Sequence, residues 1–162
     1  MEIIAHRGFW DKTDDQNTLD SFRAALSHGF GIETDLRDFN GEIVLSHDIP
    51  SKASLSMEDF IQEYVLITEK YDYRPYLALN IKSDGLQNEV KKILEKNNIT
   101  NYFLFDMSVP DTLGFIKCNL KLFTRRSEYE DENKLIDKAD GVWLDQFHGI
   151  WFKFSLINDY LN

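Results

Sequence analysis

A regular alternation of short apolar runs with amphipathic helical patterns constrains the fold more than any other feature of the chain. Residues 2–8 and 31–38 are typical of strands, and residues 14–29 between them carry apolar side chains at helical spacing. The order repeats, with strand-like runs at 76–84, 102–108, 121–130 and 141–147 and helical patterns at 56–71, 86–98, 109–119 and 130–140. Such alternation predicts an α/β fold with a parallel sheet, either doubly wound or a barrel. The tail, residues 150–162, fits a sixth helix or a terminal strand.

A β-hairpin is expected after the second strand. Residues 41–48 form another strand-like run, and the preceding dipeptide Asn40-Gly41 readily supplies the positive φ angles of a tight turn. A two-residue turn pairs positions whose numbers sum to 81, which sets Glu33 opposite Asp48. Strict register would leave His47 on the opposite face from Glu33. We therefore expect either a bulge or an early end of the ladder to bring His47 back.

Length and charge restrict the class of protein. The 162 residues fit one domain, 1–162, with 43% hydrophobic residues for a core. A net charge of -10 disfavours nucleic acid and anionic membrane surfaces, so an anionic ligand would need a local cation or a metal. Cys118 is the single cysteine, and no run approaches the ~20 apolar residues that cross a bilayer. We expect a cytoplasmic protein without stable membrane insertion.

Polar side chains gather where the predicted strands end. In parallel α/β folds the carboxyl ends of the strands form the edge at which ligands bind. The residues at these ends are His6, Arg7, Glu33, Asp35, Asn80, Lys82, Asp106, Glu128 and Asp145. The last three fit helix caps or loop anchors equally well, and Asn17 or Thr18 fits the N-cap of the first helix. The others predict a binding site at this edge.

The residue types at this edge suit a divalent cation and a phosphate. Glu33 and Asp35 are two apart, so an extended strand points both carboxylates to one face, about 7 Å apart. With the amide oxygen of Asn80, two residues before Lys82, they form an oxygen set that suits Mg²⁺ or Ca²⁺ better than zinc. We expect these three residues to hold the cation.

Two histidines and two cationic side chains complete the predicted site. His6 and His47 can divide acid and base duties, because imidazole titrates near neutrality. Arg7 and Lys82, together with a metal, would neutralise a phosphate and the charge that develops on it. His28 and His148 have no comparable partners and are interpreted as structural.

Four segments in order resemble the amino-terminal signature of the glycerophosphodiester phosphodiesterase family. The segments are "AHRG", "NTLDSFRAAL", "GIETDLR" and "SHD". The family consists of TIM (β/α)₈-barrel phosphodiesterases related to phosphatidylinositol-specific phospholipase C. The resemblance implies metal-dependent hydrolysis of a small phosphodiester to an alcohol and a phosphomonoester, through a cyclic phosphate. By residue it implies His6 and His47 as the acid/base pair, Glu33 and Asp35 as metal ligands, and Arg7 and Lys82 as phosphate contacts.

The chain departs from the family pattern at three points. Where the family has an acidic third metal ligand in a Glu-x-Lys element, this chain reads Asn80-Ile81-Lys82, which should weaken the hold on the cation. Only about eight residues separate His47-Asp48 from the helix near Ser56, so the cap over the substrate should be small. About six strand-helix units are present, whereas a complete barrel usually needs about 200 residues. Either carboxyl-terminal units are missing or the barrel is incomplete, and its open edges would favour homo-oligomers.

Three functions therefore remain to be compared. The first is a phosphodiesterase acting on a glycerophosphodiester or a similar small polyol diester. The second is a module that binds a phosphorylated ligand but has lost turnover through Asn80 or through truncation. The third is a phosphodiesterase acting on surface polysaccharide or teichoic-acid-like diesters, which the small cap would admit.

Overall fold

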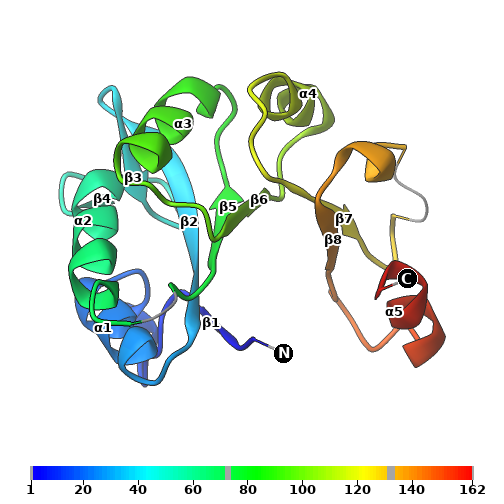
Figure 1. The fold of residues 1–162 in the computed structure, drawn as a ribbon, viewed down its shortest axis with the longest axis horizontal. Coiled ribbons are helices and arrows are strands. Elements are labelled where there is room, and N and C mark those ends of the chain that lie inside the picture. Colours follow the sequence, from blue (N-terminus) through cyan, green and yellow to red (C-terminus); the bar gives the residue numbers. More distant parts are fainter. Residues whose placement is uncertain (1, 72–73, 131–133, 162) are drawn as a thin grey trace.

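The computed structural model describes residues 2–71, 74–130 and 134–161. Within them, strands and helices alternate along the chain (Figure 1). The strands are β1 (Ile4–His6), β2 (Gly31–Phe39), β3 (Glu42–Leu45), β4 (Leu55–Ser56), β5 (Leu77–Ile81), β6 (Tyr102–Phe105), β7 (Phe123–Arg126) and β8 (Gly141–Leu144). The helices are α1 (Leu19–Ser27), α2 (Met57–Thr68), α3 (Gln87–Lys96), α4 (Val109–Lys117) and α5 (Phe154–Leu161), with short 3₁₀ turns η1 (Thr13–Asp15) and η2 (Ile136–Lys138). This is the mixed α/β architecture that the alternation predicts.

The long strand β2 organises the main sheet. Its first half pairs in parallel with β1, and its other side pairs in parallel with β5, which continues to β6. Strands β7 and β8 form a separate parallel pair that meets β6 through a bridge between Leu104 and Leu122. No pairing between β8 and β1 is present in the described part of the chain, so the sheet is open there. The arrangement matches part of a barrel, and it does not show a closed one.

Strands β3 and β4 extend the far half of β2. Asn40 and Gly41 have φ angles of 52° and 86°, and the flanking strands pair antiparallel with Phe39 opposite Glu42 and Leu36 opposite Leu45. β3 ends at Leu45. His47 therefore lies beyond the ladder, on a loop beside the middle of β2, where the Ser46 N–H donates to the carbonyl oxygen of Asp35.

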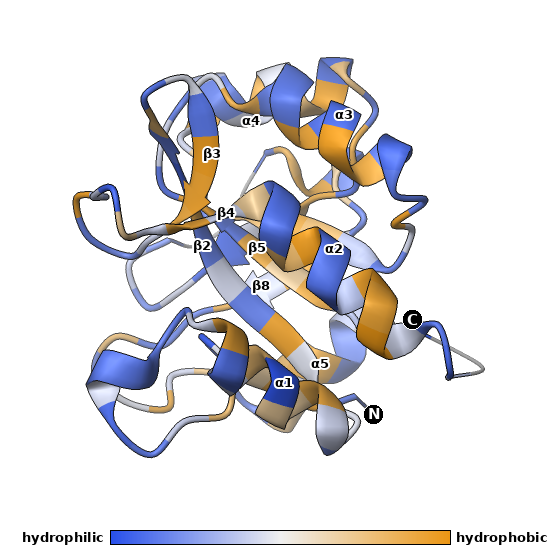
Figure 2. Cartoon of the chain, turned by 90° about the vertical axis from the view of Figure 1, so that its left-hand side faces the viewer, coloured by the Kyte–Doolittle hydropathy of each residue, from blue (hydrophilic) through white to orange (hydrophobic). Residues whose placement is uncertain are grey.

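Helices α1, α2 and α3 cover one face of the sheet (Figure 1). Thr18, Ser56 and Ser108 cap α1, α2 and α4 by accepting a backbone N–H from the residue three positions later, so their starts are defined by hydroxyl residues. Hydrophilic and hydrophobic residues alternate around these helices, and the hydrophobic ones face the sheet (Figure 2). The main core lies in this layer, where Phe22 and Phe60 are almost fully buried.

The opposite face of the sheet is the interior of the open barrel. It carries a smaller apolar cluster that includes Ala78, Phe103, Phe105, Phe123 and Trp143. Residues paired in parallel register share a face, so Glu33, opposite Ala78, and the pair Asp35 and Asn80 lie on this interior face. The interior is therefore apolar in its depth and polar toward the carboxyl ends of the strands.

Two segments near the carboxyl end refine the sequence-based expectations. The sequence predicts a helix at 130–140, of which residues 131–133 lie outside the described part. The described residues form only the short turn η2, and β8 begins three residues after it. The tail forms helix α5, which decides between the two readings of residues 150–162. Across the described ranges, no helix combines the length and apolar character needed to span a membrane.

Candidate functional site at the carboxyl edge of the sheet

The register of the parallel strands brings the predicted site residues to one edge. His6 pairs with Glu33 across β1 and β2, and Asp35 pairs with Asn80 across β2 and β5. Lys82 follows β5 on the same parity as Asn80. The side chains of Glu33, Asp35 and Asn80 are all buried. Residues far apart in the sequence therefore meet because their strands run parallel and in register.

Asp35 is the electrostatic centre of this cluster. Its side chain is fully buried, and the Nε atom of Arg7 lies 3.0 Å from Oδ2. The amide of Asn17 donates a hydrogen bond to the same oxygen at 3.1 Å, and Lys82 Nζ lies 3.7 Å from Oδ1. A buried carboxylate requires such partners, because desolvation alone would expel the charge.

Glu33 is held less firmly in its charged form. Burial, reinforced by the neighbouring charge of Asp35, raises the pKa of Glu33 to about 7. The backbone N–H of Arg7 donates to its Oε2 at 3.1 Å and opposes this rise. His6 Nε2 lies 3.9 Å from the same oxygen. A carboxyl with this pKa can exchange its proton for a cation near neutral pH at little cost.

The turn after β1 positions Arg7. Arg7 itself has a φ of 55° and Gly8 a φ of 91°, both in the left-handed region. A Cβ on Gly8 would lie 2.3 Å from the Oγ of Ser21, so only glycine fits against the start of α1. The guanidinium of Arg7 then reaches Asp35 and also donates to Gln16 Oε1 at 3.1 Å.

The two histidines lie in different surroundings. His6 is partly exposed at the end of β1, and partial burial together with the charge of Arg7 lowers its pKa. The side chain of His47 is 45% exposed and pairs through Nδ1 with Asp48 at 2.9 Å, while Arg37 holds its carbonyl oxygen. The charge of His47 also contributes to lowering the pKa of His6, so the two rings lie within electrostatic range of each other.

An ion-pair chain extends the site toward β7. Lys82 Nζ lies 3.1 Å from Asp106 Oδ2, and the other Asp106 oxygen is bound by Arg125. Arg125 also contacts Glu130, with Nε 2.6 Å from Oε2. Asp106 adopts a φ of 70° directly after β6, which turns its carboxylate toward Lys82. The charge of Lys82 is therefore shared between Asp35 and Asp106.

The residues at the edge fit a divalent cation. Asp35 Oδ1 and Asn80 Oδ1 are both buried without a hydrogen-bond partner, although their residues are cross-strand neighbours. Lys82 Nζ compensates Asp35 Oδ1 only at 3.7 Å, and a buried oxygen without a hydrogen bond is costly, so both oxygens are open to a cation such as Mg²⁺ or Ca²⁺. In the described ranges, no three His, Cys, Asp or Glu residues gather as ligands. The donor set that the sequence predicts, two carboxylates and an amide, therefore stays a prediction.

Sequence reasoning missed part of this network. Of the two residues predicted as the N-cap, Thr18 is the cap, whereas Asn17 has a φ of 55° and bridges Thr34 and Asp35. Gln16 and Arg125 were not singled out at all. The available signal was the position of Asn17, because asparagine tolerates the left-handed region better than most residues.

Two acidic residues near the last strands serve as anchors of loops. Glu128 Oε1 accepts the backbone N–H groups of Phe147 and His148. Asp145 Oδ1 accepts the N–H of Gln146, and its carbonyl oxygen accepts the indole N–H of Trp151. Asp106, by contrast, contacts the site through Lys82. Of the three residues for which the sequence left two roles open, Glu128 and Asp145 are therefore loop anchors, and Asp106 belongs to the polar cluster.

Among the comparisons with known proteins, only the one with solved structures finds matches. No family model and no curated protein matches the chain. It is similar to the crystal structure of a candidate glycerophosphoryl diester phosphodiesterase from Silicibacter pomeroyi, with a TM-score of 0.61 and 13% identity over 83% of this chain and 69% of that one. The chain has the glycerophosphodiester phosphodiesterase fold. A glycerophosphodiester phosphodiesterase from Agrobacterium tumefaciens gives a TM-score of 0.61 and 14% identity over 78% of this chain and 66% of that one.

The match covers most of this chain and about two thirds of each of the two larger proteins. The glycerophosphodiester phosphodiesterase fold places ligand sites at the carboxyl edge of its parallel strands, as barrels of this type do. That is the edge at which His6, Glu33, Asp35 and Asn80 lie. Fold and residue geometry therefore point to the same location.

Proposed function

We propose that this chain hydrolyses a phosphodiester, most simply a glycerophosphodiester, to an alcohol and a phosphomonoester with the help of a divalent cation. The observation that supports the proposal is the pair of buried oxygens without a hydrogen bond, Asp35 Oδ1, which only faces the ammonium of Lys82 at 3.7 Å, and Asn80 Oδ1. Acidic oxygens for a metal and cations for a phosphate rarely meet by chance at the ligand-binding edge of a barrel-like sheet.

Glu33, Asp35 and Asn80 would hold Mg²⁺ or Ca²⁺, which would withdraw charge from the phosphoryl oxygens. Arg7 and Lys82 would bind the same phosphate from the side of Asp35, because each already lies within 4 Å of that carboxylate. When the cation binds Asp35, Arg7 and Lys82 would pair with that carboxylate less strongly. Both side chains could then bind the phosphate of the substrate. The net charge of -10 makes these local cations necessary for an anionic ligand.

The two histidines would divide the proton transfers. A lowered pKa keeps His6 neutral, so its ring can accept the proton of a neighbouring substrate hydroxyl as that oxygen bonds to phosphorus. His47 would give a proton to the departing alcohol as its P–O bond breaks, and the carboxylate of Asp48 at Nδ1 stabilises the ring while it is charged. Water would then open the resulting cyclic phosphate with the proton roles reversed.

A binding module is the second candidate, and Asn80 is the observation that favours it. A neutral amide replaces one carboxylate, and Arg7 and Lys82 already neutralise much of Asp35. Such a site could hold a phosphorylated ligand while binding the cation too weakly for turnover. Asn80→Glu separates the two candidates, because new activity in this variant alone would favour the binding module.

The proposed function is tested by the cation dependence of hydrolysis. Purified protein is first treated with EDTA and then assayed on glycerophosphocholine and on an aryl phosphodiester with Mg²⁺, Ca²⁺ or no added ion. We expect activity that appears with a divalent ion and disappears with EDTA. Hydrolysis that is unaffected by EDTA would contradict the proposal, as would inactivity with every divalent ion.

A further inference from the structure

A pocket of mixed polar and apolar lining adjoins the proposed site on the side of His47. It has a volume of about 550 Å³ and lies between the segment that precedes α1 and the loop that follows β3. A volume of this order holds one or two sugar-sized groups. The pocket is therefore large enough to hold the organic half of a substrate.

The pocket and the phosphate site share side chains. His47 lines the pocket, as do Asn17, which binds Asp35, and Gln16, which binds Arg7. A group in the pocket would thus lie one side chain away from the proposed phosphate position. If His47 gives its proton to the departing alcohol, that alcohol lies on the His47 side and occupies this pocket.

The lining of the pocket is rich in neutral hydrogen-bonding groups. Hydroxyls come from Thr13, Ser46, Ser51 and Ser54, and amides from Gln16 and Asn17. The one carboxylate, Asp48, already pairs with the ring of His47 at 2.9 Å. None of the described side chains that line the pocket belongs to Phe, Tyr or Trp.

We infer that the leaving alcohol of the substrate is a neutral, hydroxyl-rich group of the sugar or polyol class. This inference rests on the proposed function. Several hydroxyl and amide side chains match a ligand that carries many hydroxyls, because each can both donate and accept. The pocket is open to solvent along the loop of residues 46–55, so the alcohol can belong to a longer glycan.

Other alcohol classes fit the lining less well. A quaternary ammonium group is recognised best by aromatic faces, which the lining lacks, and the carboxylate of Asp48 is 93% exposed, so water screens its charge. A lipid would need a continuous apolar wall, whereas Leu19, Leu45, Ala53 and Leu55 are interrupted by hydroxyl and amide residues. Choline and acyl-chain substrates are therefore disfavoured relative to polyols.

The inference is tested with two diesters that share the glycerophosphoryl group and differ only in the alcohol. Glycerophosphoinositol carries a neutral polyol and glycerophosphocholine a quaternary ammonium. We expect at least a tenfold preference for glycerophosphoinositol in kcat/KM and in the Kd that titration calorimetry gives for His6→Ala with Ca²⁺. Equal values, or a preference for glycerophosphocholine, would overturn the inference.

A matched pair of variants locates the preference. Thr13→Val removes one pocket hydroxyl with little change of shape and should lower kcat/KM for glycerophosphoinositol about three- to tenfold, the worth of one hydrogen bond, without affecting glycerophosphocholine. Thr100→Val, on an exposed loop outside the pocket, should change neither. If Thr13→Val lowers kcat/KM equally for both substrates, the hydroxyl does not distinguish the two alcohols and the inference fails.

Failure of the proposed function gives a different result. Selective binding of glycerophosphoinositol without hydrolysis of any diester would overturn the hydrolase proposal and uphold the polyol pocket. Hydrolysis of both diesters at equal rates would uphold the hydrolase proposal and overturn the polyol pocket. No binding and no hydrolysis of either compound would overturn both.

Discussion

At the scale of single residues, the site is defined by how buried charges are compensated. Asp35 has no exposure to water and is stabilised by Arg7, Asn17 and Lys82, whereas Glu33 has weaker partners. The consequence is a pKa of about 7 for Glu33, raised from 4.5 by burial and then by Asp35. Glu33 is therefore expected to change its protonation near neutral pH.

The pKa of Glu33 leads to a pH dependence of stability in cation-free protein. The folded pKa lies above the unfolded value of 4.5, so the folded state binds the extra proton and its stability falls as the pH rises from about 4.5 through 7. Between pH 5 and 8 the wild type should lose up to about 3 kcal/mol more free energy of unfolding than Glu33→Gln, which cannot ionise. Urea unfolding in EDTA measures this difference.

The control for this experiment is Glu89→Gln, on the exposed side of α3, where the carboxylate pairs with Lys92. Its pH dependence should follow that of the wild type. Parallel curves for the wild type and Glu33→Gln would show that Glu33 ionises in the folded protein without penalty. The account of its burial would then be wrong.

Asp106 is expected to act as a positioning residue through Lys82. Asp106→Asn keeps the shape but removes the charge that holds Lys82 Nζ at 3.1 Å, so the ammonium should bind Asp35 alone. We expect KM to rise about three- to tenfold with a smaller change in kcat, since one charge-assisted contact is weakened. Steady-state kinetics on a phosphodiester measures both constants.

Asp84→Asn is the matched control, because this exposed aspartate accepts a hydrogen bond from the hydroxyl of Ser108 and lies outside the ion-pair chain of Lys82. It should leave KM unchanged. An unchanged KM in Asp106→Asn as well would contradict the role assigned to the ion pair with Lys82.

At the scale of elements, the turn between β1 and α1 depends on glycine. Gly8 combines a φ of 91° with a clash at 2.3 Å if a Cβ is added, whereas Gly41 in the hairpin has a φ of 86° and open space around it. Gly8→Ala should therefore cost about 3 kcal/mol or more of unfolding free energy, and Gly41→Ala about 1–2 kcal/mol from backbone strain alone. Chemical denaturation of both variants gives the comparison, and equal losses would contradict it.

The elements were predictable where local pattern and tertiary structure agree. The apolar runs and capped helices up to α4 have strong periodicity, and Asn40-Gly41 has the backbone angles that its residue types favour. The segment around Ile136 was predicted as a helix, yet its described part is only a 3₁₀ turn. The helical pattern in that segment is short and mostly polar, so its intrinsic helix propensity is weak. The return of the chain to β8 at Gly141 leaves room for only a short turn.

The site was predictable only as far as strand order determines it. Residues at the ends of parallel strands, such as His6, Asp35 and Asn80, could be gathered at one edge because parallel register places them there. Asn17 reaches the cluster from a loop, and Arg125 reaches Asp106 from β7. No local sequence pattern carries that information.

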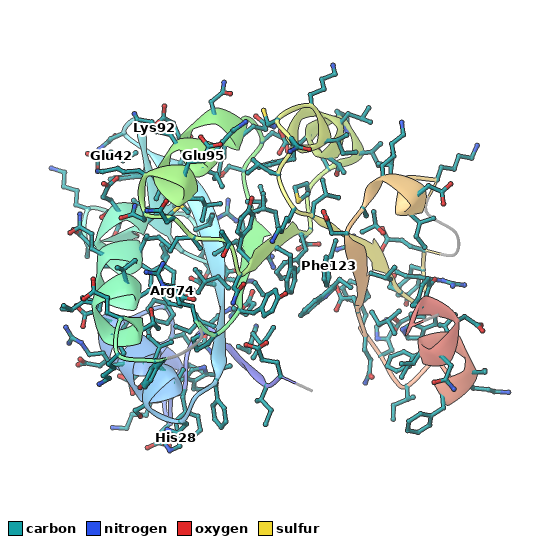
Figure 3. All side chains as sticks on the ribbon, in the orientation of Figure 1. His28, Glu42, Arg74, Lys92, Glu95 and Phe123 are labelled. Atoms are coloured by element: carbon teal, nitrogen blue, oxygen red, sulfur yellow. The ribbon has the colours of Figure 1, made fainter. Side chains whose placement is uncertain are left out.

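At the scale of the whole molecule, β7 and β8 join the main sheet through aromatic contacts. Phe123 stacks on Phe103 with ring centroids 4.0 Å apart, and Trp143 stacks on Phe105 at 4.4 Å. Figure 3 shows Phe123 directed from β7 toward β5 and β6. Backbone pairing between the two sheets is sparse, so these rings carry much of the connection.

Phe123→Ala should therefore loosen β7 and β8 without unfolding the main sheet. We expect faster hydrogen exchange of backbone amides in residues 123–126 and 141–144, with little change in β2 and β5. Phe22→Ala, in the core beneath α1, is the comparison and should weaken protection throughout the main sheet. Uniform exchange changes in Phe123→Ala would show that the two sheets open as one unit.

The most direct test of the central claim, that the carboxyl edge of this sheet hydrolyses a phosphodiester, is a ³¹P NMR time course with a divalent cation present. The diester signal should be replaced by a phosphomonoester signal in the wild type and in His28→Ala, whose histidine lies at the end of α1. His6→Ala should leave the diester intact. Loss of the diester at the same rate in His6→Ala, or no phosphomonoester in any sample, would contradict the account.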